Sequence, residues 1–277
     1  MTQYRMLIDV SRCIGCYNCY LACRDEHVGR DHRPLSAPQP ESGHKWMAIR
    51  EEERGTYPKV KMAHIPVPCQ QCAEAPCIKA ASDGAVYRRG DGIVVIDPDK
   101  ASGQRALVEA CPYGAIFWNE ALSVPQKCTF CAHLLDSGWK EPRCVEVCPT
   151  QALVFADADD RGSAVVKPDS VRSAETLHPE FGTKPLVEYM NLPKPCLVGE
   201  VSFGDQVQVP AEDISVFLRR GDHVRIAVTD CFGDFEFDNL EAGAEYQLKI
   251  EQVGYRAHEL RLRMQTDLDL GTIILDR

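Results

Sequence analysis

Residues 197–277 alternate apolar and polar positions in short runs, a pattern that predicts β-strands. Turn residues such as Gly204-Asp205, Gly221-Asp222 and Gly233-Asp234 separate the runs. Several short strands at this spacing are typical of an antiparallel sandwich or barrel. The predicted strands are Leu197 to Phe203, Ile214 to Leu218, Val224 to Thr229, Phe235 to Phe237, Tyr246 to Ile250, His258 to Arg263 and Thr272 to Leu275.

Residues 1–156 follow a different pattern, in which short apolar runs alternate with cysteine-rich loops. Gly90-Asp91-Gly92 separates two of these runs and indicates a hairpin. Two further runs each follow a cysteine–proline pair by a few residues. The predicted strands are Tyr4 to Val10, Val86 to Arg88, Ile93 to Ile96, Ala115 to Trp118 and Leu153 to Ala156.

Residues 24–68 interrupt this cysteine-rich part of the chain. They include His27, His32 and His44, none of which lies at a ligand spacing from another histidine. We therefore expect surface or interface residues here, and we interpret the insertion as a docking surface.

Residues 157–196 are punctuated by prolines and lack apolar periodicity, so they predict an extended linker. A chain of 277 residues has room for two domains. The predicted organisation is a cysteine-rich domain at 1–156, the linker, and a β domain at 197–277.

The net charge of −10 is unevenly distributed. Residues 1–156 carry equal numbers of basic and acidic side chains, so the acidic excess lies in residues 157–277. The balanced part has no run of Lys and Arg, which argues against nucleic acid as a partner. Met1 to Val10 has no basic region followed by an apolar run, and no stretch is long enough to span a membrane. We expect a cytoplasmic protein without direct membrane insertion.

Twelve of the fourteen cysteines lie within the first 148 residues and form three sets of four. The run C-x2-C-x2-C-x3-C is the bacterial iron–sulfur spacing, in which three thiolates bind one cluster and the fourth binds another. The later run C-x2-C-x12-C-x3-C has the reciprocal form. Cross-ligation predicts a first cluster on Cys13, Cys16, Cys19 and Cys148, and a second on Cys23, Cys128, Cys131 and Cys144.

The remaining set of ligands predicts a third cluster. A fourth cluster, cross-ligated with it, would need cysteines at four positions that hold other residues. Because one complete ligand set is absent while the other is intact, we predict three [4Fe–4S] clusters. The third set is Cys69, Cys72, Cys77 and Cys111, and the four substituted positions are Ala81, Ala101, Gln104 and Leu107.

Zinc and disulfides are the alternative interpretations of these cysteines. Zinc sites usually combine one C-x2-C pair with a distant second pair, and three closely spaced cysteines suit one tetrahedral ion poorly. Pro112 and Pro149 complete the cysteine–proline signature of ferredoxins. Disulfides are disfavoured by the expected reducing compartment. Cys196 and Cys231 have no partner spacing, and we expect both to be inert packing residues.

The sequence contains no recognisable set of catalytic residues. No nucleophile triad, phosphate-binding glycine loop or helix-borne His-Glu pair is recognisable. Three clusters without an organic active site predict an electron-transfer protein whose chemistry belongs to another chain.

The order of the four cysteine blocks resembles the double-ferredoxin, electron-transferring subunits of the dimethyl sulfoxide reductase family of molybdopterin enzymes. The resemblance implies an α+β, double ferredoxin-like iron–sulfur domain. Residues 229–237, followed by Leu240, Gly243 and Tyr246, resemble a transthyretin-type, carboxypeptidase-regulatory-like domain. The implied fold is therefore a ferredoxin-type domain followed by an all-β domain.

This combination is similar to the small subunits of the polyphenol-acting transhydroxylase group, with resorcinol hydroxylases and catechol dehydroxylases as relatives. Further matching stretches are Gly43 to Met47, Arg54 to Pro58, Gln126 to Thr129 and Cys131 to Asp136. The resemblance implies a heterodimer with a large catalytic subunit that carries a molybdenum or tungsten bis-pyranopterin. Two alternatives stay open: a respiratory molybdoenzyme subunit for an inorganic or S-oxide substrate, and a mainly structural partner.

Overall fold

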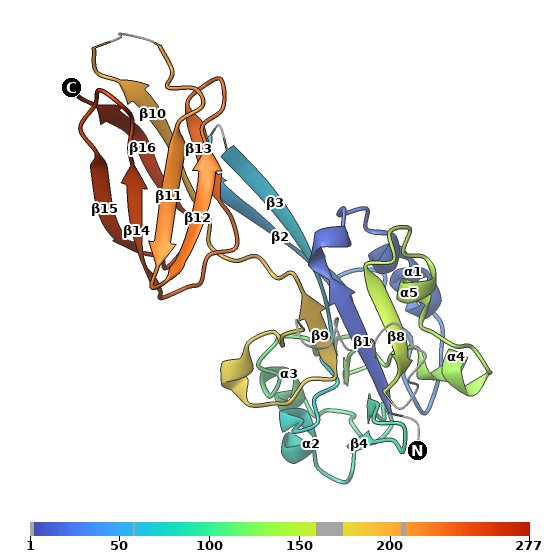
Figure 1. Cartoon of the computed structure of the whole chain (residues 1–277). Helices are drawn as coiled ribbons and strands as arrows, with labels where there is room; N and C mark the ends of the chain where they lie inside the picture. Colours follow the sequence, from blue (N-terminus) through green and yellow to red (C-terminus); the bar gives the residue numbers. More distant parts are fainter. Residues whose placement is uncertain (1–2, 58, 159–173, 206–208) are drawn as a thin grey trace. The chain divides into compact units, whose positions relative to one another are not determined.

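The computed structural model describes residues 3–57, 59–158, 174–205 and 209–277, which form two units (Figure 1). Unit 1 contains the described residues up to Glu52 together with those of Ala63–Leu192. Unit 2 contains those of Glu53–Met62 and Pro193–Arg277. Each unit has a hydrophobic core of its own.

Unit 1 is built on a three-stranded sheet in the order β8-β1-β9 (Figure 1). The central strand β1 (Tyr4–Asp9) is antiparallel to β8 (Leu153–Asp157) and parallel to β9 (Val187–Met190). Tyr189 of β9 is fully buried, and its hydroxyl donates to the Pro66 carbonyl at 3.0 Å. Part of the stretch expected to be a linker is therefore built into this core, while residues 159–173 of that stretch lie outside the described residues.

Hairpins and short helices make up the rest of unit 1, apart from the tip of one hairpin, which belongs to unit 2. Pro76 occupies the first position of α2, where its missing N–H leaves no helical hydrogen bond unmade. The expected hairpin around Gly90-Asp91-Gly92 is confirmed, with Val86 paired to Ile96. The hairpins are β2 (Met47–Thr56) with β3 (Lys59–Pro68), β4 (Val86–Arg88) with β5 (Val94–Ile96), and β6 (Phe117–Asn119) with β7 (Val124–Gln126); the α-helices are α1 (Asn18–His27), α2 (Pro76–Ala80), α3 (Ala106–Glu109), α4 (Ala132–Asp136) and α5 (Arg143–Glu146).

Unit 2 contains two sheets, in the orders β13-β10-β16 and β12-β11-β14-β15. Each of the seven strands predicted in this region is present, with small changes at the ends. The pair β10–β16 is parallel, which differs from the expected wholly antiparallel arrangement. The strands are β10 (Leu197–Phe203), β11 (Ser215–Arg220), β12 (His223–Val228), β13 (Asp234–Phe237), β14 (Glu245–Ile250), β15 (His258–Arg263) and β16 (Leu268–Leu275).

The two sheets of unit 2 share one core. Alternate residues of β11, β13 and β14 are buried. Leu197 and Phe235 of one sheet thereby pack with Val216, Leu218 and Leu248 of the other. All five side chains are at most 2% exposed. The alternation of apolar and polar residues recognised in the sequence therefore produces the shared core of this unit.

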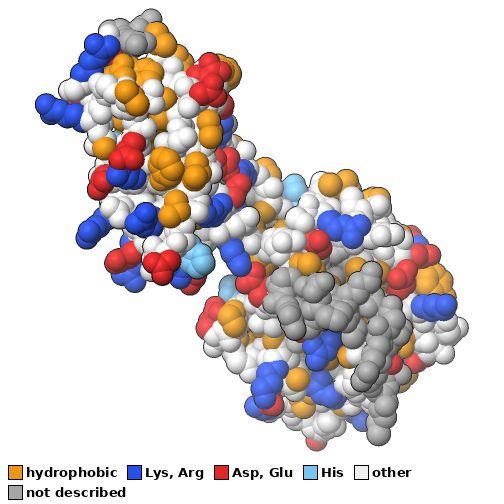
Figure 2. Space-filling view, viewed as in Figure 1, with side chains coloured by type: hydrophobic (Ala, Val, Ile, Leu, Met, Phe, Trp, Pro, Cys, Tyr) orange, Lys and Arg blue, Asp and Glu red, His pale blue; other side chains and the backbone are white. Residues whose placement is uncertain are grey.

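The surface of unit 2 mixes charges of both signs with apolar side chains (Figure 2). Val224, Ile226 and Val228 of the edge strand β12 are between 45% and 61% exposed. No helix of the described residues combines the length and apolar character needed to cross a membrane.

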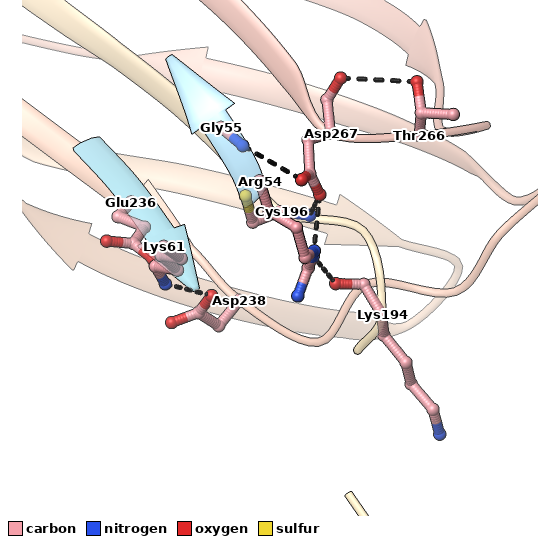
Figure 3. Close-up of polar contacts among 9 residues, drawn as sticks. All are labelled: Arg54, Gly55, Lys61, Lys194, Cys196, Glu236, Asp238, Thr266 and Asp267. Atoms are coloured by element: carbon pink, nitrogen blue, oxygen red, sulfur yellow. Dashed lines mark hydrogen bonds and ion pairs between the residues drawn. The ribbon is translucent and has the colours of Figure 1, made fainter. Parts of the chain in front are cut away.

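The tip of the β2–β3 hairpin belongs to unit 2, where ion pairs bind it to the strands (Figure 3). Asp267 accepts from Arg54 Nη2 at 2.7 Å, from Gly55 N at 3.1 Å and from Cys196 N at 2.9 Å. Lys61 pairs with Glu236 and Asp238 (Figure 3). One end of the insertion expected to be a docking surface is thus part of this unit.

Asp267→Asn tests this anchorage. Burial opposes ionisation of Asp267, but Arg54 and the Cys196 N–H outweigh it and hold its pKa below the ordinary value. The carboxylate therefore contributes stability at neutral pH, and this contribution is lost only as the pH falls through the lowered pKa. We expect the substitution to lower the stability of unit 2 by about 1–3 kcal/mol. Hydrogen exchange should then be faster in β10 and β16.

Asp222→Asn is the matched control, because Asp222 is exposed in the turn between β11 and β12. Equal exchange rates in the two variants at neutral pH would contradict the role given to Asp267.

Candidate iron–sulfur centre

The first cysteine loop follows β1 and wraps through left-handed backbone. Gly15 and Tyr17 have φ values of +65° and +61°, and α1 begins directly afterwards. Cys19 and Cys23 are four residues apart on α1, so their side chains lie on the same face of the helix. One helix thus presents ligands of two predicted sets.

Cys148 lies beside the first loop although it is distant in the sequence. Burial raises the pKa of Cys13, and the charges of Cys148 and Cys16 raise it further. Burial likewise raises the pKa of Cys19 to about 12, with contributions from Cys13, Cys148 and Cys16. These mutual effects require proximity, so the structure brings the four members of the first predicted set together.

The second set is buried more deeply. Burial raises the pKa of Cys23, and the charges of Cys128 and Cys131 add to the effect. The pKa of Cys144 is raised by burial and then by Cys131, Cys128 and Cys23. The four thiols converge even though Cys23 comes from α1 and the other three come from the segment that carries α4 and α5.

The third set surrounds a cavity between α2, β5 and the loop after α3. The cavity has a volume of about 20 Å³ and is lined by the four cysteines and their neighbours. The Ala115 N–H donates to Cys111 Sγ at 3.4 Å, and β6 begins at Phe117, two residues after the expected start. The lining cysteines are Cys69, Cys72, Cys77 and Cys111.

The donor chemistry fits iron–sulfur clusters. None of the fourteen cysteines forms a disulfide. A buried thiol with a raised pKa stays protonated unless a cation stabilises the thiolate, and bound iron supplies that charge. Left-handed residues Gln71 and Phe130 lie in two of the C-x2-C turns, and the Phe130 N–H donates to Cys128 Sγ at 3.4 Å. Such N–H donors are expected around cluster sulfurs.

Of the four positions of the missing ligand set, two are buried and two are partly buried. Ala101 and Leu107 are at most 1% exposed and belong to a small apolar core with Ala81 at its edge. The Gln104 amide accepts from Ser82 N at 3.1 Å and donates to the Lys100 carbonyl at 2.9 Å. These side chains occupy positions where a fourth cluster would need thiolates.

Two expectations about single residues were wrong. His27 and His44 are only 2% and 4% exposed, so they are not surface residues. Cys231 is exposed, so it is not a packing residue, whereas Cys196 is buried as expected.

A histidine group that was not predicted from the sequence lies beside the second set of cysteines. Ring nitrogens of His27, His32 and His133 lie within 4.8 Å of one another. His133 bonds Glu26 at 3.0 Å, and His27 Nε2 lies 3.7 Å from Cys131 Sγ. Burial lowers the pKa of His27 to about 3, so its ring is neutral. No spacing pattern could reveal the group, because His133 comes from a distant helix.

This histidine group is poorly arranged for a metal ion. The rings of His32 and His133 stack with centroids 3.7 Å apart and planes at 17°. A single ion cannot lie in the planes of two rings stacked in this way. We interpret the group as a hydrogen-bonded shell beside Cys131.

Known proteins match the chain, one of them over nearly its whole length. A family described as a 4Fe-4S dicluster domain matches residues 60–158. The pyrogallol hydroxytransferase small subunit of Pelobacter acidigallici is 41% identical over 280 residues, which cover 99% of this chain and all of that protein. A putative dimethyl sulfoxide reductase iron-sulfur subunit of Halobacterium salinarum is 36% identical over 69% of this chain and 80% of its own length. A sulfite dehydrogenase subunit of Allochromatium vinosum is 34% identical over 69% of this chain and 83% of its own length.

The cysteine loops and the matching family define an iron–sulfur protein of the 4Fe-4S ferredoxin type. The chain belongs to the family of the pyrogallol hydroxytransferase small subunit, among the iron–sulfur subunits of the dimethyl sulfoxide reductase group. The resemblance predicted from the sequence is confirmed.

Gly15→Ala should disrupt the first cysteine loop and lower the iron bound per chain. A Cβ atom at Gly15 would lie 2.6 Å from the His64 ring, and the φ of +65° disfavours any side chain. Gly29→Ala is the control, because it imposes the same backbone strain at φ +67° but meets no atom within 4 Å. Iron analysis that finds equal iron in the two variants would contradict this account.

Proposed function

We propose that this chain carries electrons for a large molybdopterin subunit that transfers, adds or removes hydroxyl groups on polyphenols. The observation that carries the proposal is the nearly full-length similarity to the pyrogallol hydroxytransferase small subunit, in a chain whose thiols converge in three groups. A large subunit with a molybdenum or tungsten bis-pyranopterin is the partner this implies.

The three thiol groups support three [4Fe–4S] clusters with the ligand sets given by cross-ligation. Bound clusters would supply one-electron uptake and release. The residues of this chain would hold the iron through thiolates, exclude water and direct backbone N–H groups at sulfur. Their role would be to bind and tune the clusters, with substrate bound by the partner.

Of the three sets of cysteines, the first is the candidate for the set that lies nearest the large subunit. Cys16 is exposed, whereas every member of the second set is buried. Ile14 beside it is 64% exposed, and Leu21 on α1 is 58% exposed. Exposed apolar side chains next to a redox centre are suited to a protein interface.

Unit 2 has the features of a transthyretin-type β domain, and we propose a stabilising or binding role for it. Its two sheets, seven strands and single core support this assignment. The second candidate function is electron transfer in a respiratory molybdoenzyme. Similarity to the dimethyl sulfoxide reductase subunit favours it, but that similarity covers only 69% of this chain.

Iron analysis tests the ligand sets. We expect about twelve iron and twelve acid-labile sulfide atoms per chain. Cys23→Ser should damage the cluster bound by Cys128, Cys131 and Cys144, and Cys148→Ser should damage the one on the first loop. Electron paramagnetic resonance can assign each loss.

Cys196→Ser is the control for these substitutions and should leave the iron content unchanged, because Cys196 is outside the three groups. About sixteen iron atoms per chain, or stoichiometric zinc, would overturn the ligand assignment.

The partner can be tested by purification and assay. The chain alone should be inactive towards di- and trihydroxybenzenes, and the complex with the large subunit should act on them. Leu21→Glu should reduce recovery of the large subunit while iron is retained, because a charge would be buried at the interface. Val253→Glu is the control, because Val253 is 95% exposed in unit 2.

Turnover by the chain alone would contradict the assignment. A complex that reduces an inorganic oxyanion and ignores every phenol would favour the respiratory alternative.

A further inference from the structure

Lys127 is the only lysine or arginine that is buried among the described residues, with 2% of its surface exposed. Its ammonium group donates to the Val94 carbonyl and, at 3.1 Å, to the Cys128 carbonyl. Within the described part of the chain, no carboxylate forms an ion pair with it. Two neutral carbonyls therefore hold a buried positive charge.

The side chain lies between two groups of cysteines. Lys127 lines the cavity surrounded by Cys69, Cys72, Cys77 and Cys111. Its second hydrogen bond goes to the backbone of Cys128, a member of the second set. The same ammonium group therefore adjoins both proposed cluster sites.

The electrostatic effects agree with this position. Burial raises the pKa of Cys77 and of Cys128 to about 11 in each case, and the charge of Lys127 acts against that rise. Lys127 also opposes the rise at Cys111. One lysine thus stabilises thiolates of both sets.

A buried ammonium group is costly unless a negative charge lies nearby. Neutral carbonyls satisfy its hydrogen bonds but do not balance its charge. Clusters bound by four thiolates carry net negative charge, which increases when an electron is added. A fixed positive charge between two such clusters therefore favours their reduced state.

We propose that Lys127 provides a fixed, buried positive charge that raises the reduction potentials of both the second and the third cluster. This inference rests on the proposed function, because it requires clusters on both sets. The cluster on Cys13, Cys16, Cys19 and Cys148 lies outside its contacts and keeps a potential independent of it.

The test is a redox titration of the purified holoprotein, followed by electron paramagnetic resonance, in the wild type and in Lys127→Met. Methionine keeps the length and apolar stem of lysine but removes the charge. At a fixed solution potential, the ratio of reduced to oxidised form should fall about tenfold for the second and third clusters. The first cluster should titrate as in the wild type.

Lys79→Met is the matched control, because this side chain is 75% exposed although it follows Cys77 by two residues. Solvent screens its charge, so its removal should leave all three titrations unchanged. Lys127→Arg should keep the wild-type order of potentials, because it keeps the charge.

Unchanged potentials in an iron-replete Lys127→Met protein would overturn the inference, and so would equal shifts in all three clusters. If the Met variant loses iron while the Arg variant retains it, the charge is needed for assembly and the inference is supported. Loss of iron in both variants would indicate a packing role and overturn it. A wild type without three clusters would instead overturn the proposed function.

Discussion

The constraint that governs unit 1 is the burial of sulfur atoms that must become anionic to bind iron. Cys23 and Cys144 lie deep in the core, where burial opposes the thiolate. Low-dielectric surroundings make such charges costly unless a cation or hydrogen-bond donors accompany them. Three features lower the free-energy cost of these buried charges. They are the left-handed residues that shape the loops, the N–H groups that point at sulfur, and the buried Lys127.

The two units consequently reach stability by different routes. Unit 1 has a three-stranded sheet and short helices, and five buried cysteines belong to its core, so ligation of iron would add to its stability. Unit 2 closes through alternating apolar side chains contributed by two sheets. The pairs of Arg54 with Asp267 and of Lys61 with Glu236 add the hairpin tip to it. Metal loss should therefore affect unit 1 first.

Local patterns explain which features the sequence could predict. The alternation of apolar and polar residues predicted all seven strands of unit 2, and the spacing of the cysteines predicted their grouping. Both patterns involve residues that are close together in the sequence. The pairing of β9 with β1, the hairpin tip in unit 2 and the contact of His27 with Cys131 join residues that are far apart. No periodicity or spacing encodes such contacts. Sequence separation also hid the burial of His27, which depends on α4.

The four positions at which a fourth cluster would need thiolates bear on how a ferredoxin-type fold could dispense with a cluster. Removing a cluster without compensation would leave a cavity, and cavities in a core are destabilising in proportion to their volume. Here Leu107 and Ala101 are buried in an apolar core, and the Gln104 amide satisfies backbone groups of Ser82 and Lys100. That part of unit 1 is closed by ordinary packing, and the neighbouring Cys69 set keeps its ligands. The Cys69 set therefore adjoins this apolar core, which includes Cys72 and Cys77, and Lys127 also lines its cavity.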